Sequence, residues 1–244
     1  MASHFACIGI PSALRDDLTQ FIDTIFPIAT PPQRADGARL LAWNDTSGAS
    51  LYLHLNEQGS IECLTPSFCG LRERQVKAKA IVPDERCRFC DVLHVEVLDD
   101  KGEMFYPLLL QVEDVEAIRD RIEPEKIILL RVTGFAEDLQ SWPEEEAFHA
   151  SQESQKLKYA TQSRGPSGMF NTPWTPHAFM TGKVVESNSM INTQSGIDFL
   201  HLVVDSYGGA YDVVAPSQAH PIEPGAIVRC SCWMVGSLNY AASN

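Results

Sequence analysis

The residues with the clearest chemical spacing are four cysteines in two short pairs. Cys87 and Cys90 form a Cys-x-x-Cys around the start of the segment FCDVLHVEV (89–97), and Cys230 and Cys232 form a Cys-x-Cys further along the chain. Together, four thiolates could hold a zinc ion. A redox Cys-x-x-Cys normally opens a helix, whose N-terminus lowers the thiol pKa, whereas this one precedes a strand pattern. We therefore expect free thiols, with no bound metal and no cofactor.

A histidine follows the first cysteine pair, but an internal repeat argues against a metal role for it. The segment DVLHVEV (91–97) recurs as DFLHLVV (198–204), and His201, the counterpart of His94, has no cysteine pair before it. Side chains alternate between the two faces of a strand, so each histidine lies on the face opposite the apolar residues beside it. We expect both to be strand histidines that are paired with a neighbour across the sheet.

The similarity extends on both sides of these two strands. Before them, KAIVPDE (79–85) resembles GKVVESN (182–188), and after them IEPEKII (122–128) resembles IEPGAIV (222–228), in the same order. The offset between the copies varies from 103 to 107 to 100 residues while the order of the blocks is kept, which indicates one repeated structural unit with loops of different length. The two copies are expected to span 76–140 and 178–240.

Each copy predicts the same series of elements. Alternating apolar runs separated by Asp and Gly clusters predict a strand, a loop, a β-hairpin and a fourth strand after Ile-Glu-Pro. The first copy also has apolar residues at helical spacing over 112–122. The segment 141–177, rich in Pro, Ser and Gln, is expected to be a linker or a crossing arm that contains a short helix.

The N-terminal part, 1–72, predicts a small α+β unit. The segment FACIGI (5–10) has the pattern of a strand, and a helix is expected to begin at a Ser12 cap and to end before Pro27. Two further strand patterns occur between 38 and 68. The second of these patterns, LHLNEQGSIECLTPS (53–67), resembles LHLVVDSYGGAYDVVAPS (200–217) of the second copy. A diverged third repeat in the N-terminal part is therefore an alternative.

The pattern TGKVV…FLHLVVDSYGGAYDVVA…IEPGAIV…MVG, residues 181–236, resembles the OB-fold, a small Greek-key β-barrel. The resemblance implies a mainly β protein with two OB-like barrels, and SH3-like barrels are the alternative. Neither copy has a clear fifth strand, so each barrel is either open or completed by another segment. We expect the arm at 163–177 to cover the exposed strand edge, and a second chain is the alternative.

Composition limits the classes of partner. There are 19 Lys and Arg against 32 Asp and Glu, which gives a formal net charge of −13 and disfavours nucleic acid and anionic membranes. We see no secretory signal and no apolar run of membrane-spanning length. Seven cysteines, an odd number, fit a reducing compartment. We expect a cytoplasmic protein that does not contact a membrane and that is a monomer or a homodimer.

Catalytic motifs with a local signature are absent from the sequence, including the phosphate-binding and dinucleotide-binding glycine loops and the nucleophile elbow. An enzyme remains an alternative if a site assembles where the two copies meet. Its candidate catalytic residues are Asp91, His94, Asp198 and His201.

The leading expectation is a non-enzymatic binding or scaffold protein that engages a protein or an uncharged ligand. Binding of single-stranded nucleic acid is the alternative that the OB-fold resemblance implies, because such folds stack bases on aromatic side chains. The candidate ligand-binding residues are Phe105, Tyr106, Phe199 and Tyr211. Packing of these four rings in the core is the competing interpretation.

Overall fold

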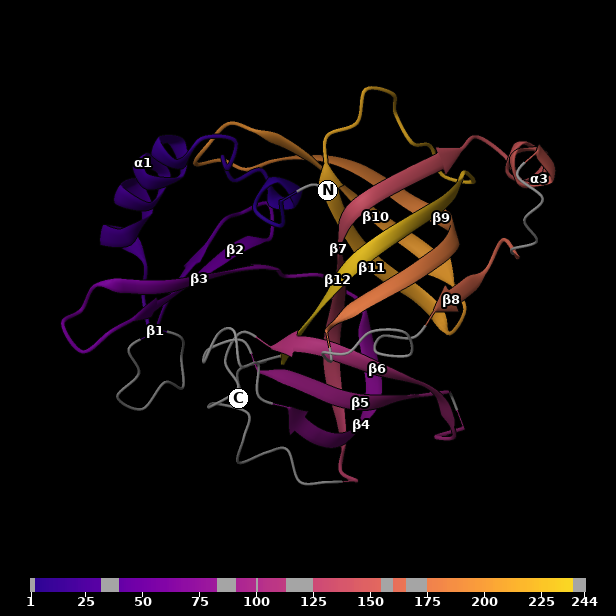
Figure 1. Cartoon of the computed structure of the whole chain (residues 1–244), viewed down its shortest axis with the longest axis horizontal. Helices are drawn as coiled ribbons and strands as arrows, with labels where there is room; N and C mark the ends of the chain where they lie inside the picture. Colours follow the sequence, from indigo (N-terminus) through magenta and orange to yellow (C-terminus); the bar gives the residue numbers. More distant parts are fainter. Residues whose placement is uncertain are drawn as a thin grey trace.

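The computed structural model describes most of the chain, and its described part is mainly β, which confirms that part of the expected fold class. The strands form a three-stranded sheet and a nine-stranded sheet (Figure 1). The described residues are 3–31, 40–82, 91–99, 101–112, 125–154, 160–165 and 175–238.

The N-terminal unit pairs one helix with the three-stranded sheet. Its elements in chain order are the 3-10 turn η1 (Ala6–Ile8), the helix α1 (Arg15–Ile25), the 3-10 turn η2 (Phe26–Ile28) and the strands β1 (Leu40–Asn44), β2 (Ala49–Leu55) and β3 (Ile61–Phe68). The order β1-β2-β3 is an antiparallel meander. The two strand patterns between 38 and 68 are thus confirmed.

Two expectations for this unit were wrong. The segment FACIGI holds a single 3-10 turn, not a strand, because Gly9 has φ +69° and a side chain there would meet the backbone oxygen of Ile197 at 2.6 Å. The helix begins at Arg15, with Leu14 at the N-cap and no side-chain cap. Asp16 and Asp17 lie in the first turn, where their negative charges stabilise the positive end of the helix dipole. This charge interaction takes the place of the expected Ser12 cap.

The two repeat copies supply the long strands. The first copy forms β4 (Glu73–Val82), β5 (Val92–Leu98), β6 (Met104–Val112) and β7 (Ile127–Trp142), and the second forms β9 (His177–Ile191), β10 (Asp198–Ser206), β11 (Gly209–Pro216) and β12 (Ile227–Leu238). All eight predicted strands are present. The helix predicted over 112–122 lies almost wholly outside the described residues.

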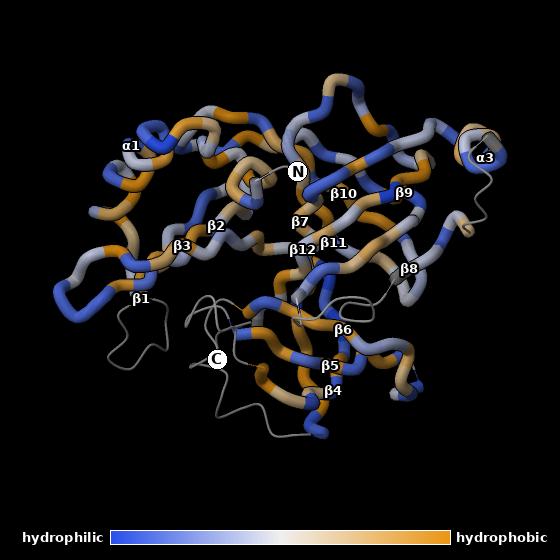
Figure 2. Tube along the Cα trace, viewed as in Figure 1, coloured by the Kyte–Doolittle hydropathy of each residue, from blue (hydrophilic) through white to orange (hydrophobic). Residues whose placement is uncertain are grey.

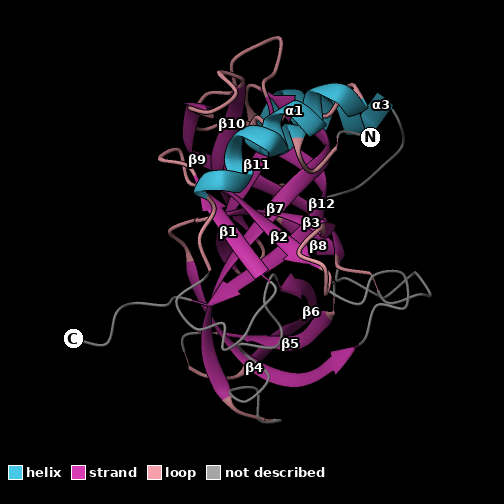
Figure 3. Ribbon diagram, turned by 90° about the vertical axis from the view of Figure 1, so that its left-hand side faces the viewer, coloured by secondary structure: helices cyan, strands magenta, loops and turns pink. Residues whose placement is uncertain are grey.

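The segment between the copies is partly ordered. It contains the helix α3 (Glu145–Ser154) and the short strand β8 (Ser163–Gly165), which pairs with β9. Figure 3 shows α3 at the same end of the molecule as α1, away from β4, β5 and β6. The predicted short helix is therefore confirmed.

Strand pairing closes two rings that share β7 and β12. The first ring runs β4-β5-β6-β12-β7 and returns to β4, and the second runs β9-β10-β11-β7-β12 and returns to β9. In each ring the third strand of the meander pairs in parallel with the last strand of the other copy. Figure 1 shows the shared strands crossing between the two rings.

This exchange corrects the expectation that the arm at 163–177 supplies the closing strand. The missing fifth strand of each copy is the fourth strand of the other copy. Gly134 of β7 pairs with Met234 of β12, and these positions are equivalent when Ile127 is matched to Ile227. The arm contributes β8, which covers only the edge of β9 over Phe179–Thr181.

Alternation along the shared strands divides their side chains between two cores. Leu130, Val132 and Met234 point into a core that runs through both rings. Phe135 and Val235 point the other way and pack with the N-terminal unit. Figure 2 shows the corresponding alternation of hydrophobic and hydrophilic positions along the strands. The N-terminal unit is thus packed onto the outside of the second ring.

Sharing two strands predicts that both rings unfold together. Leu108, on β6 of the first ring, is fully buried, so Leu108→Ala should lower the free energy of unfolding by about 3 kcal/mol. Urea unfolding followed by far-ultraviolet circular dichroism and by tryptophan emission should still give one coincident transition. Leu129→Ala, at a half-exposed position on β7, serves as the control and should change little. Two separated transitions would contradict the shared-strand account.

Candidate functional site

The candidate site begins at an irregularity in the shared strand pair. Cys232 pairs with Ala136 and Ser231 pairs with Asp138, so Glu137 is an extra residue in β7. A β-bulge of this kind redirects a side chain away from regular alternation. Glu137 is thereby placed where the N-terminal segment meets the start of β9.

Two histidines hold the Glu137 carboxylate. His4 Nε2 lies 3.0 Å from Oε1, and His177 Nδ1 lies 3.3 Å from Oε2. The carboxylate side chain is 11% exposed, so these contacts are largely shielded from solvent. A carboxylate accepts hydrogen bonds, so the His4 imidazole donates its Nε2–H to Oε1, while His177 contacts the other carboxylate oxygen. Both rings also pack on Trp233, with centroid distances of 5.1 Å for His4 and 4.8 Å for His177.

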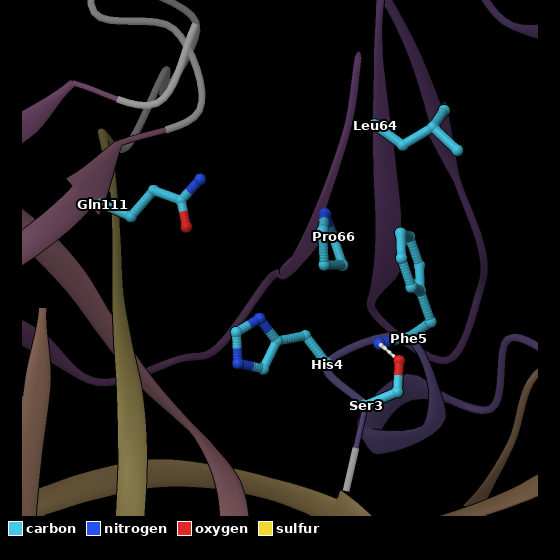
Figure 4. A pocket seen from close by; sticks show the side chains of 6 residues that line it. All are labelled: Ser3, His4, Phe5, Leu64, Pro66 and Gln111. Carbon is cyan, nitrogen blue, oxygen red and sulfur yellow. Dashed lines mark hydrogen bonds between the residues drawn. The ribbon is translucent and has the colours of Figure 1, made fainter. Parts of the chain in front are cut away.

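A cavity of about 360 Å³ lies beside this cluster. Figure 4 shows it between the β3 strand and the end of β6, with the His4 imidazole pointing toward it. Trp233 Nε1 donates a hydrogen bond to Gln111 Oε1, which ties the cluster to the cavity wall. The wall has an apolar part and a polar part. Its lining residues are Ser3, His4, Phe5, Leu64, Pro66 and Gln111.

Cys7 lies close to the same cluster but is not a nucleophile. Its thiol donates a hydrogen bond to the Ala136 carbonyl at 3.4 Å, and its side chain is fully buried. Burial first, and then the negative charge of Glu137, raise the pKa of Cys7 to about 12. The thiol therefore stays protonated and helps to hold the N-terminal segment on β7.

His201 has the cross-strand partner that the sequence predicts. Its Nε2 lies 2.8 Å from Asp212 Oδ1 on the neighbouring strand β11. Asp212 is 1% exposed and also accepts the backbone N–H of Arg72, while the Phe68 ring packs on the imidazole at 5.0 Å. This pair fastens the segment between β3 and β4 to the second ring, which is a structural role.

The four candidate catalytic residues are not brought together. His94 lies on β5 of the first ring and His201 on β10 of the second, and these strands are not paired. Asp91 precedes β5 and is half-buried, and Asp198 is exposed at the start of β10. Burial lowers the pKa of His94. None of the four is among the described residues that line the cavity beside Glu137.

Three of the four candidate ligand-binding aromatics are buried. Phe199 and Tyr211 are 1% and 0% exposed, so neither ring has a face open to a ligand. Phe105 is 38% exposed and lies 4.8 Å from the exposed ring of Tyr207, with Tyr106 next to both. Core packing therefore accounts for Phe199 and Tyr211, and also for Tyr106, which is 6% exposed and belongs to the common core. Of the four candidates only Phe105 is exposed, beside Tyr207.

The cysteine pairs provide no described metal site. Cys87 and Cys90 lie outside the described residues. Cys230 and Cys232 are buried, with their sulfurs 3.2 Å apart, on the side of β12 that faces the common core. Among the residues that the structure describes, no group of three or more His, Cys, Asp or Glu is arranged to hold a metal ion.

The sequence gives no local signal for the Glu137 cluster. His4, Gln111, Glu137, His177 and Trp233 come from five separate parts of the chain, and none belongs to a motif. The site expected at the junction of the copies had Asp91, His94, Asp198 and His201 as its candidates, and none of them belongs to this cluster. The fold alone brings these five together, through the bulge in β7 and the pairing of β12 with β6 and β9.

Replacing the carboxylate should loosen the N-terminal segment. In Glu137→Gln the side chain keeps one acceptor oxygen, so one of the two imidazole N–H groups loses its partner, at a cost of about 1 kcal/mol. We expect faster amide hydrogen exchange over residues 5–10, measured by mass spectrometry. Glu146→Gln, on the exposed face of α3, is the control. Unchanged exchange in both variants would show that the Glu137 contacts do not hold this segment.

A buried histidine in the N-terminal sheet makes stability depend on pH. His54 Nε2 contacts Thr65 Oγ1 at 3.1 Å, and burial lowers its pKa from 6.5 to about 4. The unfolded chain then binds more protons between these values, so this contribution is present above pH 6.5 and is lost as the pH falls toward 4. From about pH 7.5 to about pH 5 the loss is about 2 kcal/mol.

Urea unfolding at these two pH values tests this contribution. His54→Gln cannot titrate there, so its stability should fall less than that of the wild-type protein over the same interval. Equal losses in the two proteins would mean that His54 is not the source of the pH dependence.

Comparisons with known proteins leave the site to be interpreted from its geometry. Searches against protein families, curated proteins and solved structures give no match for this chain. Neither α1 nor α3, the α-helices in the described ranges, is long and apolar enough to cross a membrane. The arguments below therefore depend on the contacts of the described residues.

Proposed function

We propose that the protein is a non-enzymatic binding module built on two OB-like barrels that exchange their closing strands. Each ring has five strands, a three-stranded meander and the antiparallel pair β7–β12, and the third strand of the meander pairs in parallel with the last strand of the other copy. This arrangement supports the OB-like assignment. Because β7 and β12 belong to both rings, the two barrels form one rigid support. Such a support can hold a site in place at the position where the N-terminal unit joins it.

The observation that carries this proposal is the cavity beside the Glu137 cluster. Binding pockets combine apolar walls with a few fixed polar groups, and their volumes start at about 300 Å³. Here Phe5, Leu64 and Pro66 supply the apolar wall. His4 and Gln111 supply polar groups that Glu137 and Trp233 hold in place. An orientation fixed before binding reduces the entropy that a ligand must lose.

An uncharged ligand fits this cavity better than a nucleic acid does. Among the described residues that line it there is no lysine or arginine. The lysines of the basic segment on β4 are engaged in ion pairs, since Lys79 contacts Glu96 and Glu125, and Lys77 contacts Glu125. Arg72, just before β4, contacts Glu186. The net charge of −13 adds a long-range repulsion of phosphate.

The His4–Glu137 pair also resembles the orienting half of a catalytic triad, so an enzyme is the second candidate function. A triad needs a nucleophile within reach of the imidazole. Cys7 stays protonated and donates to Ala136, while Ser3 Oγ accepts the backbone N–H of Phe5 at 3.3 Å. Because neither group is activated by His4, binding is the better supported function.

A fragment screen by ¹H–¹⁵N NMR tests the proposal. Neutral fragments with an apolar group should shift the Trp233 indole and Gln111 side-chain resonances, because these groups border the cavity. Leu64→Arg should abolish those shifts by placing a charge on the apolar wall. Leu71→Arg, at a position 80% exposed, is the matched control and should retain them.

The same spectra separate this function from its alternatives. If oligo(dT) shifts resonances in a salt-dependent way and no neutral fragment does, the protein binds nucleic acid and the proposal is wrong. Fragments that shift only the resonances of Phe105, Tyr106 and Tyr207 would place the binding site elsewhere.

A further inference from the structure

The hydrogen-bond role of Gln111 at the cavity is fixed by its neighbour. The Trp233 indole has a donor and no acceptor, so the Gln111 group that faces it must be the carbonyl oxygen. The amide nitrogen, with its two hydrogens, is then left on the other side of the carboxamide. Gln111 is 8% exposed and lines the cavity, so its amide nitrogen is the donor that this side chain has available for a ligand there.

The hydrogen-bond role of His4 is also set by its neighbour, but His4 is an acceptor where Gln111 is a donor. Its Nε2 donates to Glu137, which can only accept. A neutral imidazole with a proton on Nε2 has a lone pair on Nδ1. Figure 4 shows the His4 ring turned toward the space that Gln111 and Pro66 border. In this neutral form, His4 offers the cavity an acceptor.

We propose that this cavity binds a neutral amide group, an inference that deepens the proposed binding function and rests on it. The ligand N–H donates to His4 Nδ1, and the ligand carbonyl accepts from the Gln111 amide. The substituent beside the amide packs on the apolar wall of Phe5, Leu64 and Pro66. One donor and one acceptor across an apolar cavity complement the two polar groups of an amide.

Other ligand classes leave one of these partners unsatisfied. A carboxylate or phosphate presents only acceptors, so it would face the Nδ1 lone pair with the Glu137 charge behind it. An ammonium ion presents only donors and would face the Gln111 N–H groups. An ester has the shape of an amide but lacks the N–H, so it leaves the His4 acceptor unpaired.

The direct test compares N-methylisobutyramide with its ester isostere, methyl isobutyrate. Both are titrated into the full-length protein near neutral pH, and binding is followed by the Trp233 indole and Gln111 side-chain resonances. The amide should bind about tenfold more tightly, because the ester forfeits one hydrogen bond and leaves a group unpaired. Equal affinities would overturn the amide assignment.

A matched pair of variants tests the same point from the protein side. Gln111→Glu keeps an acceptor for Trp233 but replaces the donor with a second acceptor, so the amide affinity should fall about tenfold while the indole resonance stays near its wild-type position. Gln58→Glu, in the exposed turn between β2 and β3, adds the same charge away from the cavity and should bind as the wild type does. Unchanged binding by Gln111→Glu would also overturn the assignment.

Two sources could present such an amide, a small molecule or the backbone of a polypeptide. A capped tripeptide, acetyl-Ala-Val-Ala-N-methylamide, distinguishes them, because a peptide source should bind more tightly than the single amide, whereas a small-molecule source should not. If the amide and the ester bind equally well in the cavity, the amide assignment fails and the binding function stands. If the cavity resonances respond to no neutral compound, both proposals fail.

Discussion

The antiparallel pairing of β7 with β12 is the interaction on which the rest of the structure depends. In the described residues each repeat copy has four strands of its own, and an unclosed sheet would expose a row of backbone donors and acceptors. The last strand of each copy completes the ring of the other copy, so the pair β7–β12 is part of both rings. The common core then runs through both rings without a boundary. The two copies are therefore one cooperative unit, even though the repeat makes them separable in sequence.

The functional site follows from the same strand pair. A regular antiparallel pairing would keep Glu137 in alternation, but the bulge opposite Ser231 and Cys232 frees it to meet His4 and His177. Through these contacts the N-terminal segment is fixed on the outside of the second ring, and the cavity forms between it, β3 and β6. The groups that orient His4 and Gln111 are thus set by the fold before any ligand arrives. This preorganisation is what makes the donor and acceptor pattern of the cavity interpretable.

The sequence predicts local features well because alternation and turn residues report on local structure. It predicts the eight long strands of the copies, the side of the strand that His201 occupies and the presence of a partner for His201 across the sheet. Alternation does not say which strand pairs with which, so it could not predict the exchange of β7 and β12. The turn at Gly9 was missed because a short apolar run fits either a strand or a buried turn. Members of the Glu137 cluster lie too far apart in the chain to form a pattern.

The central claim is that the fold presents one acceptor and one donor to a ligand across the cavity beside Glu137. A crystal structure of the protein grown with N-methylisobutyramide tests this most directly, because it locates the ligand atoms. The account predicts the amide nitrogen within hydrogen-bond distance of His4 Nδ1, the carbonyl oxygen within hydrogen-bond distance of Gln111 Nε2, and the isopropyl group against Leu64 and Pro66. A ligand bound in the reverse orientation, or outside this cavity while the cavity remains empty, would contradict it.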